Sequence, residues 1–292
     1  RLLLRLPANQ NKIFFSDNGS TAVEVALKMT FQYWYNKGKR RKKVIAFRNA
    51  YHGDTFGSMS VSGKSAFTNA FEHFLFDVSY IDAPVPGNEE KTLRQLNAEL
   101  TKNKDKTACF IFEPLIQGTA GMLIHNSKTL SEMILLCRKK NVLTIADEVM
   151  TGFGRTGKFF ASDHLTAKPD IICLSKGITG GAMALGVTSC TNAVYAAFFS
   201  ENKMKTFFHG HSYTANPLAC AAANASLDLF EKEKTLQKVG RISSKHAAFA
   251  NRVKKNPAVK EVRHLGSILA IEIKLNMISY KKILLYKSII IL

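Results

Sequence analysis

The chain of 292 residues is long enough for one large domain with a sizeable core, or for one domain and part of a second. Hydrophobic residues make up 46% and charged residues 22%, and no apolar run reaches the roughly 18 residues needed to cross a bilayer, which argues against a membrane protein. The net charge of +19 would suit nucleic-acid binding, but the lysines are scattered and the basic run 39–43 has no interleaved aromatic residues, so we expect a solvated loop there and no nucleic-acid partner.

The cysteines are widely spaced and odd in number: Cys109, Cys137, Cys173, Cys190 and Cys220. This pattern predicts buried, reduced thiols rather than disulfides or a zinc site, and hence a reducing, cytoplasmic setting. The sequence begins at Arg1 without a methionine and without a signal-peptide pattern, so we expect a missing start rather than a processed secreted protein.

Near the amino-terminal end, a helix is predicted over residues 22–35, preceded by Ser-Asp-Asn-Gly-Ser-Thr-Ala-Val-Glu at 16–24. Thr21 and Glu24 have the spacing of a capping box at a helix start. Gly19 and Ser20 lie just before it, so free backbone N–H groups, the positive helix end and a hydroxyl would meet there. The segment predicts either a phosphate site or a plain helix cap.

A strand is predicted over residues 43–47, and Asn-Ala-Tyr-His-Gly-Asp at 49–54 follows it directly. An aromatic side chain at that position, Tyr51, could stack on a flat cofactor bound at the edge of a sheet. The alternative is a tyrosine of the core or of its rim.

Two charged residues follow apolar strands further along the chain. Strands are predicted over 108–112, 142–146 and 171–174, with a helix over 131–140. Asp147 follows the second strand and Lys176 the third, and each, taken alone, resembles a solvated strand end. Because the carboxyl ends of parallel strands meet at one edge, where ligands bind, we expect both side chains on that edge, with Asp147 placed to keep a cofactor's ring nitrogen protonated.

Residues 152–157, Gly-Phe-Gly-Arg-Thr-Gly, match the G-x-G-x-x-G pattern of dinucleotide-binding proteins. That pattern requires a helix directly behind it. The following Lys-Phe-Phe-Ala-Ser-Asp has no helical period, so we expect no NAD site.

A strand is also predicted over residues 184–188, and a turn at 208–216 leads into a helix predicted over 217–230. His209 and His211 lie in that turn without a third ligand, so no metal is expected. A turn that carries hydroxyl groups before a helix is a second candidate anion site.

Continuous apolar strands between amphipathic helices predict an α/β fold with a mostly parallel sheet covered on both faces. A lysine-rich helix is predicted over 236–255, after which 261–274 predicts a strand pair around Gly266. We therefore divide the chain into a large domain, 1–255, and the start of a smaller domain, 256–292, whose residues after about 275 look atypical.

In this order, the motifs resemble those of the class III, fold type I pyridoxal-phosphate (PLP) aminotransferases. The motifs are the phosphate loop at 16–24, Tyr-His-Gly at 51–53, Glu-Pro…Gln-Gly at 113–118, Asp-Glu…Gly-Arg-Thr-Gly at 147–157 and Ser-Lys-Gly at 175–177. The likeness runs from about Ile13 to Lys274. Segments 14–28, 112–118 and 209–214 resemble the subfamily that moves the amino group of S-adenosylmethionine to 8-amino-7-oxononanoate in biotin synthesis.

The resemblance implies a role for each of several positions. Lys176 resembles the Schiff-base lysine, Asp147 the partner of the pyridine nitrogen, and Tyr51 the ring that covers the cofactor. The positions implied for the phosphate are Gly19 and Ser20, together with His211 and Ser212 reaching from a neighbouring subunit. The positions implied for the substrate are Tyr51, Asp54, Arg155, Lys176 and Gly210.

The resemblance further implies a homodimer with shared active sites and a ping-pong transfer, in which Lys176 acts as general base. The alternatives are a relative acting on ornithine, acetylornithine or 4-aminobutyrate, and an inactive truncated remnant.

We expect the family's N-terminal segment before Arg1 and its carboxylate-binding arginine after Lys274, whereas 276–292 contain no arginine. Our hypothesis is that this tail arises from a truncated or frame-shifted reading of the coding region.

Overall fold

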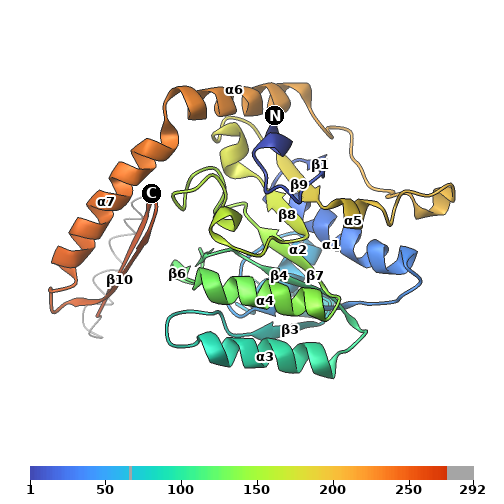
Figure 1. Cartoon of the computed structure of the whole chain (residues 1–292), viewed down its shortest axis with the longest axis horizontal. Coiled ribbons are helices and arrows are strands. Elements are labelled where there is room, and N and C mark those ends of the chain that lie inside the picture. Colours follow the sequence, from blue (N-terminus) through green and yellow to red (C-terminus); the bar gives the residue numbers. More distant parts are fainter. Residues whose placement is uncertain (66–67, 275–292) are drawn as a thin grey trace.

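A seven-stranded sheet lies at the centre of the molecule (Figure 1). The computed structural model describes residues 1–65 and 68–274. The strand order in the sheet is β1-β9-β8-β7-β4-β2-β3. These strands are Lys12–Ser16 (β1), Lys43–Phe47 (β2), Val78–Ile81 (β3), Thr107–Phe112 (β4), Leu143–Asp147 (β7), Ile171–Leu174 (β8) and Gly186–Cys190 (β9). The predicted α/β class is confirmed.

Five neighbouring strands, from β3 to β8, run parallel to one another, which confirms the mostly parallel sheet. β9 runs antiparallel to both β8 and β1. The strand predicted at 184–188 therefore exists, two residues later and in the opposite direction to β8. The connection 175–185 holds one short turn of 3-10 helix, Lys176–Thr179, and a parallel crossover needs a dozen residues or more.

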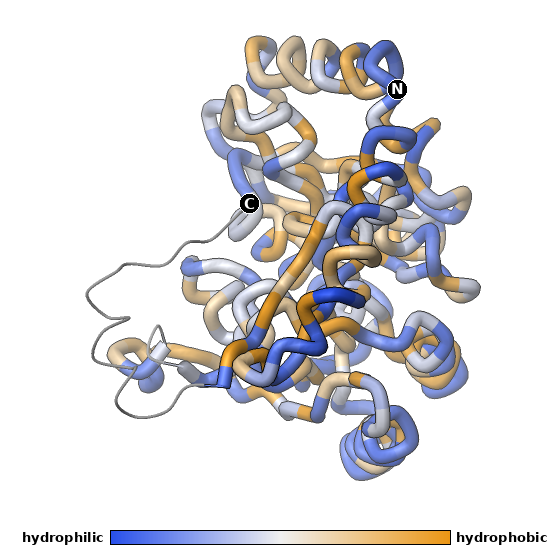
Figure 2. The backbone as a smooth tube through the Cα atoms, turned by 90° about the vertical axis from the view of Figure 1, so that its left-hand side faces the viewer, coloured by the Kyte–Doolittle hydropathy of each residue, from blue (hydrophilic) through white to orange (hydrophobic). Residues whose placement is uncertain are grey.

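The two faces of the sheet are covered by different helices. Gly19–Asn36 (α1) packs against the side chains of Val44 and Ala46, whereas Ile45 and Phe47 of the same strand face the other core, with Glu89–Lys102 (α3) and Ser127–Lys139 (α4). This alternation follows from the period of two along a strand. Figure 2 shows hydrophobic stretches of the backbone, in orange, running through the middle of the molecule.

Several elements were not predicted: β1, β3, α3, the short helix Phe56–Val61 (α2) and the strand pair Ile116–Gln117 (β5) and Leu123–Ile124 (β6). α4 begins four residues before the predicted start, because the side chain of Asn126 accepts the N–H groups of Lys128 and Thr129 at 3.0 and 3.1 Å. Short 3-10 turns lie at Leu2–Leu4, Asn69–Phe74, Ala161–His164 and Lys203–Lys205.

The carboxyl-terminal part forms an arch beside the sheet (Figure 1). Its elements are Pro217–Lys232 (α6), Thr235–Val253 (α7), Val259–Leu265 (β10) and Ile268–Ile273 (β11), whereas the short helix Asn192–Tyr195 (α5) directly follows β9 and lies outside the arch. β10 and β11 form the strand pair predicted around Gly266. Ser267 N–H donates to the Arg155 carbonyl at 3.0 Å, and Arg263 donates to the Gly121 carbonyl at 2.9 Å. The domain boundary at 255/256 stays a prediction, and the tail 276–292 lies outside the described residues.

The basic run 39–43 is not a uniformly solvated loop. Arg41 is buried over the ring of Trp34, 4.0 Å from its centroid, and its guanidinium donates to Asp105 and to the carbonyls of Thr107 and Asn141. An arginine can be buried in this way because a planar fork of donors matches several acceptors at once.

All five cysteines are free thiols, and four are buried while Cys220 is half-buried, so the predicted burial is confirmed for four of them. Within residues 1–65 and 68–274, no helix is both long enough and apolar enough to span a membrane.

Candidate active site

The carboxyl ends of β4, β7 and β8 bring Glu113, Asp147 and Lys176 to one edge of the sheet. β7 pairs in parallel with β4 on one side and with β8 on the other. Asp147 is the last residue of β7, and Lys176 lies just beyond Leu174, where β8 ends. The prediction that Asp147 and Lys176 share this edge is confirmed.

Asp147 is held by a buried histidine that the sequence analysis did not single out. His52 Nδ1 lies 2.7 Å from Asp147 Oδ2, and Asp147 Oδ1 accepts the N–H of Val149 at 3.0 Å. Both side chains are nearly excluded from solvent. His52 Nε2 has no hydrogen-bond partner within the described part of the chain. An Asp in a fixed orientation with a histidine behind it is a strong acceptor for a proton carried by a ligand.

The start of α1 differs from the predicted capping box. Asn18, not Thr21, is the cap: its side chain accepts the N–H of Thr21 at 3.0 Å, and Thr21 Oγ1 accepts the N–H of Asn18 at 3.0 Å. Glu24 instead accepts the N–H groups of Gly57 and Ser58 at the start of α2. The predicted Thr21–Glu24 pairing was wrong because a side chain pointing out of the first turn can also bond to a neighbouring helix.

Gly19 and Ser20 are the first two residues of α1, so their N–H groups have no partner inside the helix. Gly19 lies close against Val149, since a Cβ on this residue would come within 2.6 Å of the Val149 side chain. The positive end of α1 is thereby brought next to the Asp147 strand end. Ser20 Oγ accepts the N–H of Asp54 at 3.2 Å, which joins this helix start to the loop that carries Tyr51.

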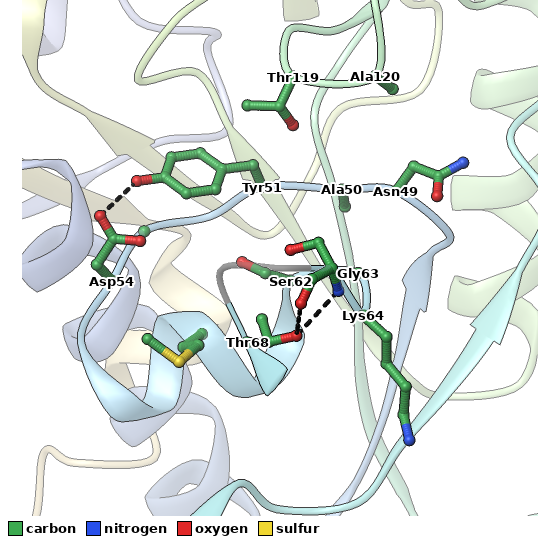
Figure 3. A pocket seen from close by; sticks show the side chains of 13 residues that line it. Asn49, Ala50, Tyr51, Asp54, Ser62, Gly63, Lys64, Thr68, Thr119 and Ala120 are labelled. Atoms are coloured by element: carbon green, nitrogen blue, oxygen red, sulfur yellow. Dashed lines mark hydrogen bonds between the residues drawn. The ribbon is translucent and has the colours of Figure 1, made fainter. Parts of the chain in front are cut away.

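Tyr51 and Asp54 form a pair on the wall of a pocket (Figure 3). The Tyr51 hydroxyl donates to Asp54 Oδ2 at 2.8 Å. Partial burial, together with this bond, raises the pKa of Tyr51 to about 12, so the hydroxyl keeps its proton at neutral pH. The pair borders a cavity of about 200 Å³, whose wall also includes Asn49, Thr119 and Ala120.

Lys176 is exposed and has a left-handed backbone conformation, with φ of +46°. Its ammonium group makes no hydrogen bond or ion pair with residues 1–65 or 68–274. Non-glycine residues in this conformation are uncommon and cluster at functional sites. Ser175, directly before it, is anchored by a hydrogen bond from its hydroxyl to the Leu185 carbonyl at 2.7 Å. The lysine therefore projects from a fixed turn and is free to react.

Two buried glutamates flank Asp147. Glu113 accepts the N–H groups of Tyr51 and Gly118, both at 3.1 Å, and Glu148 accepts those of Ala161 and Ser162, both at 2.7 Å. Burial raises the pKa of each carboxyl group to about 7. Successive residues of a strand point to opposite faces, so Glu148 lies on the other side of the sheet from Asp147.

The remaining predicted site residues lie further out. Gly210, His211 and Ser212 belong to the segment between α5 and α6, which projects from the body of the molecule in Figure 1. His211 Nδ1 lies 3.6 Å from Asp17 Oδ2, just before the start of α1. Arg155 is half-buried, its carbonyl is bound by Ser267, and its side chain has no ion pair in the described ranges.

The segment 152–157 forms turns and is followed by the 3-10 turn Ala161–His164 rather than by an α-helix. The helix that a dinucleotide site requires behind this pattern is therefore missing, as predicted. Among the residues that the structure describes, no three His, Cys, Asp or Glu side chains are grouped as metal ligands.

The family model for class-III aminotransferases matches residues 1–288, a wider range than the motifs alone span. The chain belongs to the class-III aminotransferases. Adenosylmethionine-8-amino-7-oxononanoate aminotransferase from Synechococcus elongatus is 43% identical over 274 residues, which cover 92% of this chain and 64% of that protein. This aminotransferase chain thus spans less than two thirds of that relative's length.

Solved structures agree with this assignment. The adenosylmethionine-8-amino-7-oxononanoate aminotransferase from Methanocaldococcus jannaschii superposes with a TM-score of 0.89 at 36% identity, over 95% of this chain and 64% of that one. An amine transaminase from an uncultivated Pseudomonas species, solved in its PLP-bound form, gives a TM-score of 0.86 at 31% identity, over 92% and 64%. The sheet of this aminotransferase is therefore that of the fold type I enzymes.

Proposed function

We propose that this chain binds pyridoxal phosphate at Lys176 and that the protein to which it belongs is a transaminase. The observation that carries the proposal is the meeting of Lys176, Asp147 and the start of α1 at one edge of the sheet, in a member of the class-III aminotransferases. A lysine, a buried carboxylate and a helix N-terminus match the aldehyde, the ring nitrogen and the phosphate of that cofactor.

The side chains and backbone groups at this edge of the sheet fit the chemical groups of this cofactor. The first N–H groups of α1 and the Ser20 hydroxyl supply donors for a phosphate. Each oxygen of Asp147 takes part in one hydrogen bond, with His52 or with Val149, and keeps a further lone pair for a ring N–H. Lys176 would hold the cofactor covalently, and Tyr51 would cover its ring.

When bound, pyridoxal phosphate supplies an electron sink that weakens the C–H bond next to the donor amine. Asp147 would keep a proton on the ring nitrogen, because a buried carboxylate fixed by His52 favours the positive form of its partner. Lys176 Nζ would act as the general base for the proton on the donor carbon and then as the general acid that returns this proton. Tyr51 and Asp54, which are joined by a hydrogen bond, would orient the amine.

We further propose S-adenosylmethionine as amine donor and 8-amino-7-oxononanoate as acceptor, a step of biotin synthesis in the cytoplasm. The names and identities of the two adenosylmethionine-dependent relatives support this choice. Arg155 and Gly210 would contribute to the substrate side.

The proposed assembly is a homodimer, with His211 and Ser212 of each copy reaching the phosphate held by the other. Large apolar side chains on the segment that carries them support it, since Phe199, Met204, Phe208 and Tyr213 are between 68% and 79% exposed. Exposed apolar side chains of this size are typical of surfaces that another chain covers.

The test is to load the chain with pyridoxal phosphate and then to add single amine donors while following the visible absorption band. S-adenosylmethionine should bleach the band, and 8-amino-7-oxononanoate should restore it. Lys176→Ala is the control, which should show neither change. Bleaching by ornithine, acetylornithine or 4-aminobutyrate instead would assign the chain to another branch of the class, and a stable band with every donor would contradict transamination by this chain.

A further inference from the structure

Glu113 is a buried acid that the proposed reaction does not use. It directly follows β4, and Phe112 pairs with Ala146 in the neighbouring strand, so Glu113 and Asp147 occupy equivalent positions at the same edge. The residue is 5% exposed. No Lys or Arg among the described residues forms an ion pair with its carboxylate. A carboxylate buried without a cation is costly, so a specific interaction has to offset the loss of hydration.

The two oxygens of Glu113 join two separate loops. Oε1 accepts the N–H of Tyr51, and Oε2 accepts the N–H of Gly118, each at 3.1 Å. Both bonds need an acceptor, which a carboxylate provides on both oxygens, whereas a glutamine would present an NH2 group to one of the two N–H donors. The carboxylate is therefore suited to hold both backbones at once.

Tyr51 is in this way fixed at its two ends. Glu113 holds its backbone, and Asp54 holds its hydroxyl at 2.8 Å, as Figure 3 shows for the second contact. The next residue, His52, is tied to Asp147 at 2.7 Å. The loop therefore carries its aromatic ring in one orientation before any ligand arrives, which lowers the entropy cost of binding.

We propose that Glu113 is a positioning residue of the cofactor site, which fixes the backbone of Tyr51 and through it the aromatic ring that covers the cofactor. The inference rests on the proposed binding of pyridoxal phosphate. It assigns to Glu113 a role that acts through Tyr51 and involves no contact with the cofactor.

Glu148 offers a matched control. It is as deeply buried as Glu113, accepts two backbone N–H groups in addition to the Thr151 hydroxyl at 3.3 Å, and has its pKa raised to about 7 by the same cause. Its partners, Ala161 and Ser162, belong to a 3-10 turn on the other side of the sheet. Glu148→Gln should therefore match the loss of stability in Glu113→Gln without changing the orientation of Tyr51.

The experiment measures two properties of the chain loaded with pyridoxal phosphate: the apparent dissociation constant, and the visible circular dichroism per bound cofactor, which reports how the ring is held. Glu113→Gln should weaken binding roughly tenfold and reduce the dichroism, whereas Glu148→Gln should stay within about twofold of the wild type. In a Tyr51→Ala background, Glu113→Gln should have no further effect, because the double variant removes the residue through which Glu113 acts.

Equal binding and equal dichroism in Glu113→Gln and Glu148→Gln would overturn the inference, as would an undiminished effect of Glu113→Gln in the Tyr51→Ala background. If Glu113→Gln does not fold, Glu113→Asp decides, because it keeps a carboxyl group but is too short to reach both loops. It should weaken binding and reduce the dichroism to a smaller extent, and wild-type values would overturn the inference. A wild-type chain that binds no cofactor at all would overturn the proposed function and this inference with it.

Discussion

Glu148 illustrates how a single buried acid makes stability depend on pH. Its folded-state pKa of about 7 lies above the ordinary value of 4.5, so folding takes up a proton between these two pH values. Its stabilising contribution is complete below about pH 4.5 and is lost as the pH rises through 7. Because other acids titrate in the same range, the contribution is visible only against a variant that lacks this group.

We predict that Glu148→Gln flattens the pH dependence of stability. Between pH 4.5 and 7 the free energy of unfolding of the wild type should fall relative to that of the variant, by up to about 3 kcal/mol. Urea unfolding at several pH values measures this difference. Parallel curves for the two proteins would show that Glu148 does not titrate in this window.

Single residues were predictable from the sequence where they end a strand. Asp147 and Lys176 follow continuous apolar runs, so their shared edge could be inferred from the parallel sheet alone. His52 and Glu113 were missed because their roles depend on partners far away in the chain, Asp147 for one and Tyr51 for the other. For the same reason, the side chain of Glu24 was expected to cap the start of its own helix, α1, whereas it accepts an N–H group at the start of α2.

Three α-helices of the described part of the chain, α1, α4 and α6, begin with an asparagine whose side chain caps the first turn, and two of these caps make a matched pair because only that of α1 lies at the proposed phosphate site. Asn18 caps α1 and Asn126 caps α4, each by accepting N–H groups of the first turn. We predict that Asn18→Ala and Asn126→Ala each lower the free energy of unfolding by about 1 kcal/mol. Asn18→Ala should also weaken binding of pyridoxal phosphate, and Asn126→Ala should not. Thermal unfolding and cofactor titration of both variants check this, and equal affinities would count against a phosphate site at α1.

Elements were predictable to the extent that their pattern is local. The strand pair at Gly266 and the helices at 22–35, 217–230 and 236–255 were all found, with ends displaced by a few residues. β1 and β3 are short strands at the two edges of the sheet and lack a long apolar run. α3 carries a visible period, Thr92, Leu96 and Leu100 on its buried face, so it was within reach of the sequence.

At the scale of the whole molecule, the β10–β11 hairpin packs against the backbone of residues 155–157 at Gly266. This residue has φ of +58°, and a Cβ there would lie 2.3 Å from the Arg155 carbonyl oxygen. We predict that Gly266→Ala destabilises the chain by about 2 kcal/mol or more. Gly240→Ala, in α7 with nothing within 4 Å, should instead stabilise it by about 0.5–1 kcal/mol. Denaturant unfolding distinguishes a destabilised from a stabilised variant, and a neutral Gly266→Ala would mean that the hairpin does not pack against residues 155–157.

The segment between α5 and α6 gives a second prediction at this scale. If a second copy covers its apolar side chains, light scattering should give the mass of a dimer for the wild type, and Phe199→Ser combined with Phe208→Ser should weaken dimerisation at least about tenfold. The same double variant should lose affinity for pyridoxal phosphate, because His211 and Ser212 of the partner would no longer reach the phosphate. A monomeric wild type with full cofactor affinity would contradict the shared site.

The central claim is that Lys176 holds pyridoxal phosphate, and borohydride reduction followed by peptide mass mapping tests it most directly. The account predicts a cofactor adduct on the peptide that contains Lys176, at close to one per chain, with no other lysine labelled to a comparable extent. Asp147→Asn should retain the adduct with weaker binding, and Lys176→Ala should abolish it. Labelling spread over many surface lysines, unchanged in Lys176→Ala, would contradict the account.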